Sequence, residues 1–290
     1  MDSPQPELLR STFPSFILAA IFFGVTVLQT YQCLLQPKLQ NKVGLVAIVV
    51  CFLDGVHFVC SVAMIYPPSV YQDRYGDEVA LWSLKAMGTA KVLLMVVIQS
   101  YYLHLIRDFA QKVLVRREVS RAVKSFTAAT FFYAISVAVA NGLDRGKATT
   151  ISNFSLAFQY LIYIGYASAA AIDCSIAVIM SIFLLLAAPD ANFAQKGTRQ
   201  VVMHLIFHFV GAGILTVASS LATMGLHWSN PSSVLYLTVE FIAPRLYSNS
   251  ILALFNARAR LNRKFDAFPE LRSYSTVFFG ENQDILSSSQ

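Results

Sequence analysis

Six ionisable side chains lie inside stretches that are otherwise apolar, and they are the residues most able to carry proton, ion or ligand chemistry. They comprise three acids and three bases: Asp54, Asp173, Glu240, Lys85, Lys91 and Arg245. A charge at the centre of a bilayer costs about 2.5–3.5 kcal/mol on insertion scales, so such groups normally face a bundle interior and pair. The set predicts either a polar core that lines a ligand pocket or ion path, or a structural network that fixes helix register.

The depth of each charge within its stretch predicts its partner. At 1.5 Å per helical residue, Asp54 lies roughly 16 Å deep and Lys91 roughly 18 Å deep from the other side, so we expect these two to pair near the midplane. Arg245 at roughly 16 Å and Asp173 at roughly 22 Å are close enough in height to pair where their helices approach. Two shallower charges, each roughly 9 Å deep, are predicted to border an outer-facing cavity: Lys85 and Glu240.

Three histidines within the apolar stretches raise the question of a metal site. His57 follows Asp54 by three residues and so shares its helical face, while His204 and His208 share a face at a spacing that suits zinc. A zinc-dependent lipid hydrolase needs a third ligand at the same height. However, His57 lies roughly 21 Å from the inner surface and His208 only about 10 Å from it. We therefore expect interhelical hydrogen bonds from these histidines, with the hydrolase as a third-ranked alternative.

Sequence motifs for other chemistry are missing. The chain has no Walker loop, no nucleophile elbow and no HExxH motif. A retinal protein needs a Schiff-base lysine in its last helix, and the last apolar stretch carries Arg245 and no lysine. We expect no cofactor and no enzymatic activity.

Seven apolar stretches must position these residues. Their ranges are 13–34, 43–66, 79–105, 125–141, 158–187, 201–226 and 234–256. About 20 helical residues cross a hydrocarbon core of roughly 30 Å, and lipid offers no partner to a bare backbone amide, so each stretch must be a helix. The chain is 56% hydrophobic and 13% charged, with a mean hydropathy of +0.56, which excludes a soluble globular protein. The predicted fold class is an all-α integral membrane protein, a seven-transmembrane-helix bundle.

The distribution of basic residues predicts the orientation in the membrane. Of the 22 Lys and Arg residues, fifteen lie on one side, in segments 35–42, 106–124 and 188–200 and in the tail after residue 256. Only four lie on the other side, and three lie inside the stretches. Basic segments resist translocation, so we expect the N-terminus outside and the C-terminus in the cytosol. Asn153 begins a glycosylation sequon in a segment that this rule places outside. The charge of +6 thus reflects membrane topology, and no nucleic-acid partner is expected.

This topology divides the chain into three parts. Residues 1–12 form a short outer N-terminus, residues 13–256 the seven-helix domain, and residues 257–290 a cytosolic basic amphipathic segment with a flexible tail. The segment holds either a helix along the inner leaflet or the ordinary basic flank of a last helix. All four cysteines lie within apolar stretches, so no structural disulfide is expected.

The last apolar stretch resembles a known family. Residues 243–258 read APRLYSNSILALFNAR, and residues 170–177 read AAIDCSIA around Asp173. Both are similar to recurring elements of a large fungal family of seven-helix membrane proteins, catalogued as domain of unknown function 6534. The resemblance implies the fold and a fungal membrane origin, and it implies no activity.

A weaker likeness is to G-protein-coupled receptors, through the seven stretches, the basic second inner connector and Arg107-Asp108 after the third stretch. The acidic–Arg order of the receptor motif is reversed here, Ala243 replaces its last-helix Asn, and its disulfide cysteines are missing. The leading interpretation is a receptor-like sensor in the plasma membrane or an endomembrane, with a small-molecule ligand and a cytosolic signalling partner. The alternative is a small-solute or proton-coupled transporter, whose buried acids would titrate during transport.

Overall fold

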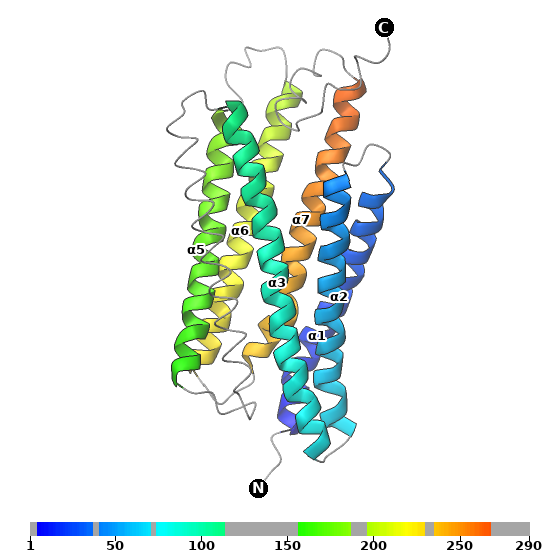
Figure 1. The fold of residues 1–290 in the computed structure, drawn as a ribbon, viewed down its shortest axis with the longest axis vertical. Coiled ribbons are helices and arrows are strands. Elements are labelled where there is room, and N and C mark those ends of the chain that lie inside the picture. The colour runs from blue at the N-terminus through cyan, green and yellow to red at the C-terminus, as the bar shows by residue number, and fades with distance from the viewer. Residues whose placement is uncertain are drawn as a thin grey trace.

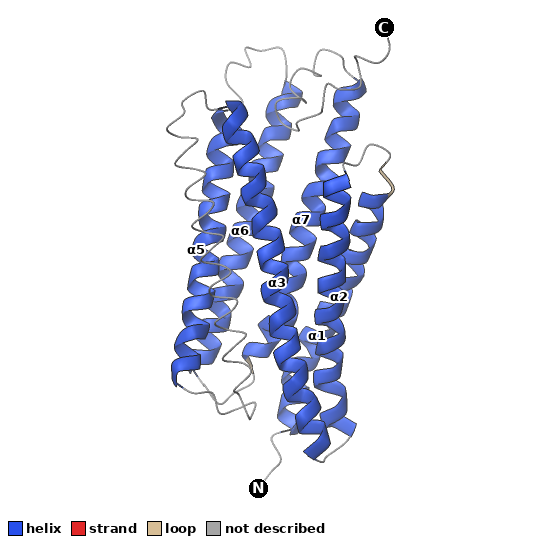
Figure 2. Cartoon of the chain, viewed as in Figure 1, coloured by secondary structure: helices blue, strands red, loops and turns tan. Residues whose placement is uncertain are grey.

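The computed structural model describes six long helices and no strand in residues 5–36, 41–70, 74–113, 156–186, 196–229 and 235–267 (Figures 1 and 2). The helices are α1 (Gln5–Leu34), α2 (Asn41–Val70), α3 (Arg74–Val113), α5 (Leu156–Leu186), α6 (Lys196–Ser229) and α7 (Tyr236–Ala267). Each matches one predicted stretch, mostly extended by a few residues at its ends. The predicted stretch 125–141 lies outside the described residues. A helix at this stretch, which would bring the total to seven, therefore stays a prediction.

The end of α1 shows why a helix stops where its apolar stretch does. The amide of Leu35 still bonds to the carbonyl of Tyr31 at 3.1 Å, and the amide of Gln36 turns back to the carbonyl of Cys33 at 3.3 Å. The next residue in the sequence is Pro37, which has no N–H to donate. Polar Gln36 thus closes the helix at the edge of the apolar stretch.

Four of the described helices contain segments long and apolar enough to cross a membrane. These segments are Thr12–Leu34, Asn41–Ile65, Val79–Arg107 and Tyr163–Ile182. The outer surface of the bundle is apolar, with Phe52, Phe207 and Ile214 among its exposed side chains, while charged groups such as Arg245 are buried. A soluble protein has the opposite arrangement. The chain is therefore membrane-embedded.

Interhelical hydrogen bonds establish the relative direction of the odd-numbered helices. Lys91 of α3 contacts Tyr166 of α5, and Gln99 of α3 contacts Asp173 of α5, so the contacts run in the same order along both helices. Likewise, Asn249 and Asn256 of α7 donate to the carbonyls of Phe22 and Gln29 of α1, at 3.1 and 3.0 Å. Helix α3 is thus parallel to α5, and α1 is parallel to α7. A parallel pair α3 and α5 is what a crossing by 125–141 between them would require.

Two apolar clusters form the core on either side of a polar middle. The first includes Val50 of α2, Leu94 of α3 and Ile251 of α7, and the second includes Met64 of α2 and Met87 of α3. On α2 and α3 the buried polar groups fall between these clusters: Asp54 and His57 between Val50 and Met64, and Lys91 between Met87 and Leu94. The packing therefore holds the charged residues at mid-helix.

The close approach of α5 and α6 gives a testable prediction. A Cβ atom at Gly213 would lie 3.1 Å from Cβ of Ala177, whereas a Cβ at Gly211 would meet nothing within 4 Å. We expect Gly213→Val to lower the free energy of unfolding by about 1–3 kcal/mol, because overpacking forces the two helices apart. Gly211→Val is the matched control and should not lose stability, as measured by equilibrium unfolding in mixed micelles. Equal effects of both variants would contradict this helix contact.

Candidate functional site

Lys91 and Glu240 form a buried ion pair between α3 and α7. The Lys91 ammonium donates to both carboxylate oxygens of Glu240 at 2.8 Å. Tyr166 of α5 completes the group, because its hydroxyl donates to Glu240 and accepts from Lys91 at 3.1 Å. The ammonium also lies 4.4 Å from the centre of the Tyr166 ring, a favourable cation–π position. Three helices are thus tied together by one fully compensated pair.

A second ion pair joins α2 to α7. Nε of Arg245 lies 3.6 Å from Oδ1 of Asp54, and both side chains are fully buried. Another guanidinium nitrogen donates to Nδ1 of His57, one turn further along α2. Because arginine can only donate, Nδ1 must accept, which places the imidazole proton of His57 on Nε2. The guanidinium also lies 5.7 Å from the ring centre of Phe58. Arg245 therefore anchors α7 to a polar face of α2.

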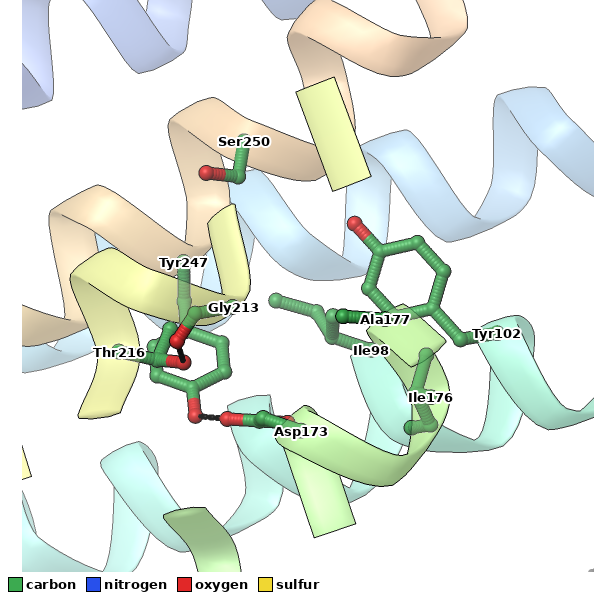
Figure 3. Close-up of a pocket in the computed structure, with 9 residues that line it drawn as sticks. All are labelled: Ile98, Tyr102, Asp173, Ile176, Ala177, Gly213, Thr216, Tyr247 and Ser250. Atoms are coloured by element: carbon green, nitrogen blue, oxygen red, sulfur yellow. Dashed lines mark hydrogen bonds between the residues drawn. The ribbon is translucent and has the colours of Figure 1, made fainter. Parts of the chain in front are cut away.

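Asp173 on α5 forms the third polar group. Its carboxylate accepts a hydrogen bond from the side-chain amide of Gln99 on α3 at 3.2 Å and another from the hydroxyl of Tyr247 on α7. Figure 3 shows Asp173 and Tyr247 meeting beside a cavity of ≈ 30 Å³, which by volume accommodates one or two water molecules. Gly213 and Thr216 of α6 line the same cavity.

The first and third groups are stacked along the same three helices. On α3 the polar residues are eight positions apart, and on α5 and α7 they are seven apart: Lys91 and Gln99, Tyr166 and Asp173, and Glu240 and Tyr247. Seven or eight residues make about two helical turns, so each helix presents both of its polar residues on one face. The result is two polar layers about 11 Å apart, both including α7.

The structure corrects the predicted pairings. Asp54 pairs with Arg245 and not with Lys91, and Lys91 pairs with Glu240. The prediction placed Asp54 and Lys91 at compatible heights, but their side chains turn to different sides of α7. The predicted pairing of Asp173 with Arg245 is also wrong, because Arg245 faces α2 while Asp173 faces Tyr247.

Lys85 and Glu240, each predicted to border an outer-facing cavity, lie in different surroundings. Glu240 is buried against Lys91, and Lys85 is partly exposed with its ammonium 5.7 Å from the ring centre of Trp82. An ammonium at the end of a flexible stem reaches an aromatic ring at the bundle surface without burying its charge. Lys85 thus lies apart from the buried groups.

The histidine and glycosylation predictions have different outcomes. The expected interhelical hydrogen bond of His57 is confirmed by its contact with Arg245. The side chains of His204 and His208 lie outside those described, and so does Asn153. Within the described residues, no group of three or more His, Cys, Asp or Glu side chains could hold a metal ion.

Three neutral partners were missed in the sequence, namely Gln99, Tyr166 and Tyr247. Gln99 carried a usable signal, because an amide within an apolar stretch needs a hydrogen-bond partner. Tyrosine gives a weaker signal, since its ring suits either a buried core or the membrane interface. Each of the three lies two helical turns, seven or eight residues, from a charged residue on its own helix, and this spacing would have identified them.

The described helices define a membrane-embedded, all-helical bundle with a polar core joined at α7. Residues 169–260 match the model of a family of unknown function (DUF6534), which confirms the resemblance seen in the fifth and seventh stretches. The matched region contains four of the polar-core residues: Asp173, Glu240, Arg245 and Tyr247. No curated protein matches the chain.

Proposed function

We propose that the protein is a non-enzymatic, receptor-like sensor in which α7 is the moving element. The observation that carries this proposal is that all three buried acids take part in contacts between α7 and other helices. Glu240 links it to α3 and α5, Asp54 links it to α2, and Asp173 links it to α5 through Tyr247. A signal that breaks any one of these contacts would change how α7 packs against the other helices.

The backbone of α7 supports movement at the same place. Pro244 lies inside the helix and has no N–H to bond to the carbonyl of Glu240, four residues earlier. Prolines of this kind are common sites of helix bending in membranes. Glu240 lies on one side of Pro244 and Arg245 on the other, so the two ion pairs hold α7 on either side of this weak point.

The sensor proposal includes a ligand, a signalling partner and a membrane location. A small-molecule ligand would act from the outer half of the bundle, where Glu240 and Lys91 lie in the predicted orientation. A cytosolic signalling partner would meet the far end of α7, which continues to Ala267. The protein would act in the plasma membrane or an endomembrane.

A sensor requires two packings whose populations shift when a contact changes. Spin labels at Arg107 of α3 and Ala257 of α7, in a cysteine-free background, would report the separation of these helices in lipid nanodiscs. We expect one dominant distance in the wild-type protein and a second, enlarged population in Glu240→Gln, because neutralisation releases Lys91. Lys85→Met, which removes a partly exposed charge from α3, should keep the wild-type distribution. A single unchanged distance in Glu240→Gln would contradict the sensor proposal.

A proton-coupled transporter is the second candidate, because a small cavity borders the buried Asp173. Purified protein in proteoliposomes with an internal pH-sensitive dye distinguishes the two functions. Proton flux that Asp173→Asn abolishes would favour the transporter. Under the sensor proposal we expect no flux above that of empty liposomes.

A further inference from the structure

Asp173 differs from the other two buried acids in how its charge is compensated. Glu240 faces the ammonium of Lys91, and Asp54 faces the guanidinium of Arg245. Asp173 is also buried, at 7% exposure, but the groups that contact its carboxylate are neutral, among them the amide of Gln99 and the hydroxyl of Tyr247. No basic side chain among those described lies within ion-pair distance of it, and the sequence of 125–141 contains no Lys, Arg or His.

An ionised carboxylate in this position would be costly. Transferring an isolated charge out of water is far more expensive than transferring a neutral group, and buried acids respond by pairing, by binding a cation or by taking up a proton. No described residue uses the first route, and two neutral hydrogen-bond donors do not neutralise a charge, so a cation or a proton is the compensation that remains.

The cavity beside Asp173 favours the smaller of these two ligands. Its walls are largely apolar and include Ile98, Ile176 and Ala177 (Figure 3). A sodium ion would need several oxygen ligands directed at it from all sides, and apolar side chains form much of the lining here. A volume of ≈ 30 Å³ suits a water molecule that delivers a proton.

We propose that Asp173 is a proton-binding site, in which the carboxyl group is neutral at neutral pH and exchanges its proton with water in the adjoining cavity. Hydronium transfers one proton to the carboxylate and leaves as water, and the reverse step regenerates the ion. The titratable groups that share the cavity are Tyr102 from α3 and Tyr247 from α7, while α6 contributes Gly213 and Thr216, which do not titrate in water. The proposal does not depend on movement of α7.

Infrared spectroscopy tests the proposal directly, because a protonated carboxyl has a carbonyl stretch that a carboxylate lacks. We expect the wild-type protein in nanodiscs at neutral pH to show this band, with the isotope shift that marks aspartate when aspartate is ¹³C-labelled. The band should vanish in Asp173→Asn and persist in Asp54→Asn, since Asp54 is paired with Arg245. An absent band in the wild-type protein, or a band that Asp173→Asn leaves unchanged, would overturn the proposal.

Two further measurements keep the test decisive. If Asp173→Asn does not fold, Tyr247→Phe retains the acid but removes its hydroxyl partner, so the band should move, and an unmoved band would overturn the assignment. Thermal unfolding in sodium chloride against choline chloride tests the rival ligand. We expect the same Tm in both salts, and a higher Tm in sodium that requires Asp173 would show a metal-cation site instead.

Discussion

Replacing Lys91 by methionine is expected to lower the free energy of unfolding by about 3–5 kcal/mol. The substitution keeps most of the side-chain volume but leaves Glu240 as an uncompensated charge among buried groups, and broken buried pairs cost this much. Equilibrium unfolding in mixed detergent micelles measures the loss. Among the residues that the structure describes, only the hydrogen bond from Tyr166 would remain to stabilise the carboxylate.

Lys85→Met is the control for this prediction, since it removes a lysine from the same helix. Lys85 is partly exposed, and its side chain contacts only the ring of Trp82 among the interactions described, so its loss should cost at most about 1 kcal/mol. If the two methionine variants were equally stable, Lys91 would not be held in a buried pair.

Replacing Arg245 by methionine should be at least as damaging, with a loss of about 3–5 kcal/mol. Arg245 is the largest fully buried side chain in the part of the chain that the structure describes, and its guanidinium contacts Asp54, His57 and Phe58 at once. The substitution strands Asp54 and removes the donor to His57. The same unfolding measurement applies.

Arg245→Lys separates charge from shape at this position. Lysine restores a positive charge but lacks the planar fork that reaches Asp54 and His57 together, so we expect it to recover only part of the lost stability. Full recovery would mean that charge alone matters and that the contact with His57 contributes nothing.

The apolar stretches predicted the described helices because lipid imposes a simple rule on the backbone. Any stretch of about 20 apolar residues must bond internally, so composition alone located α1 to α3 and α5 to α7. The ends were less well predicted. For example, α3 extends to Val113, well beyond the predicted 105, because a helix can continue past the membrane where polar side chains tolerate it.

The charged residues were identified correctly, but their partners were not. Counting residues gives height, because each helical residue rises 1.5 Å, and it therefore placed Asp54 and Lys91 at compatible depths. Pairing also depends on which way each side chain points, which turns by about 100° per residue and has meaning only when the neighbouring helices are known. Because α7 lies against both α2 and α3, Asp54 and Lys91 each pair with a residue of α7 instead.

The central claim is that α7 carries both ion-pair partners, and cross-rescue between double variants tests it most directly. We expect Glu240→Gln to restore much of the stability lost in Lys91→Met, and Asp54→Asn to do the same for Arg245→Met, since each combination removes a stranded charge. The crossed combination of Asp54→Asn with Lys91→Met should show no rescue. Rescue of Lys91→Met by Asp54→Asn, with none by Glu240→Gln, would contradict the arrangement of charges around α7.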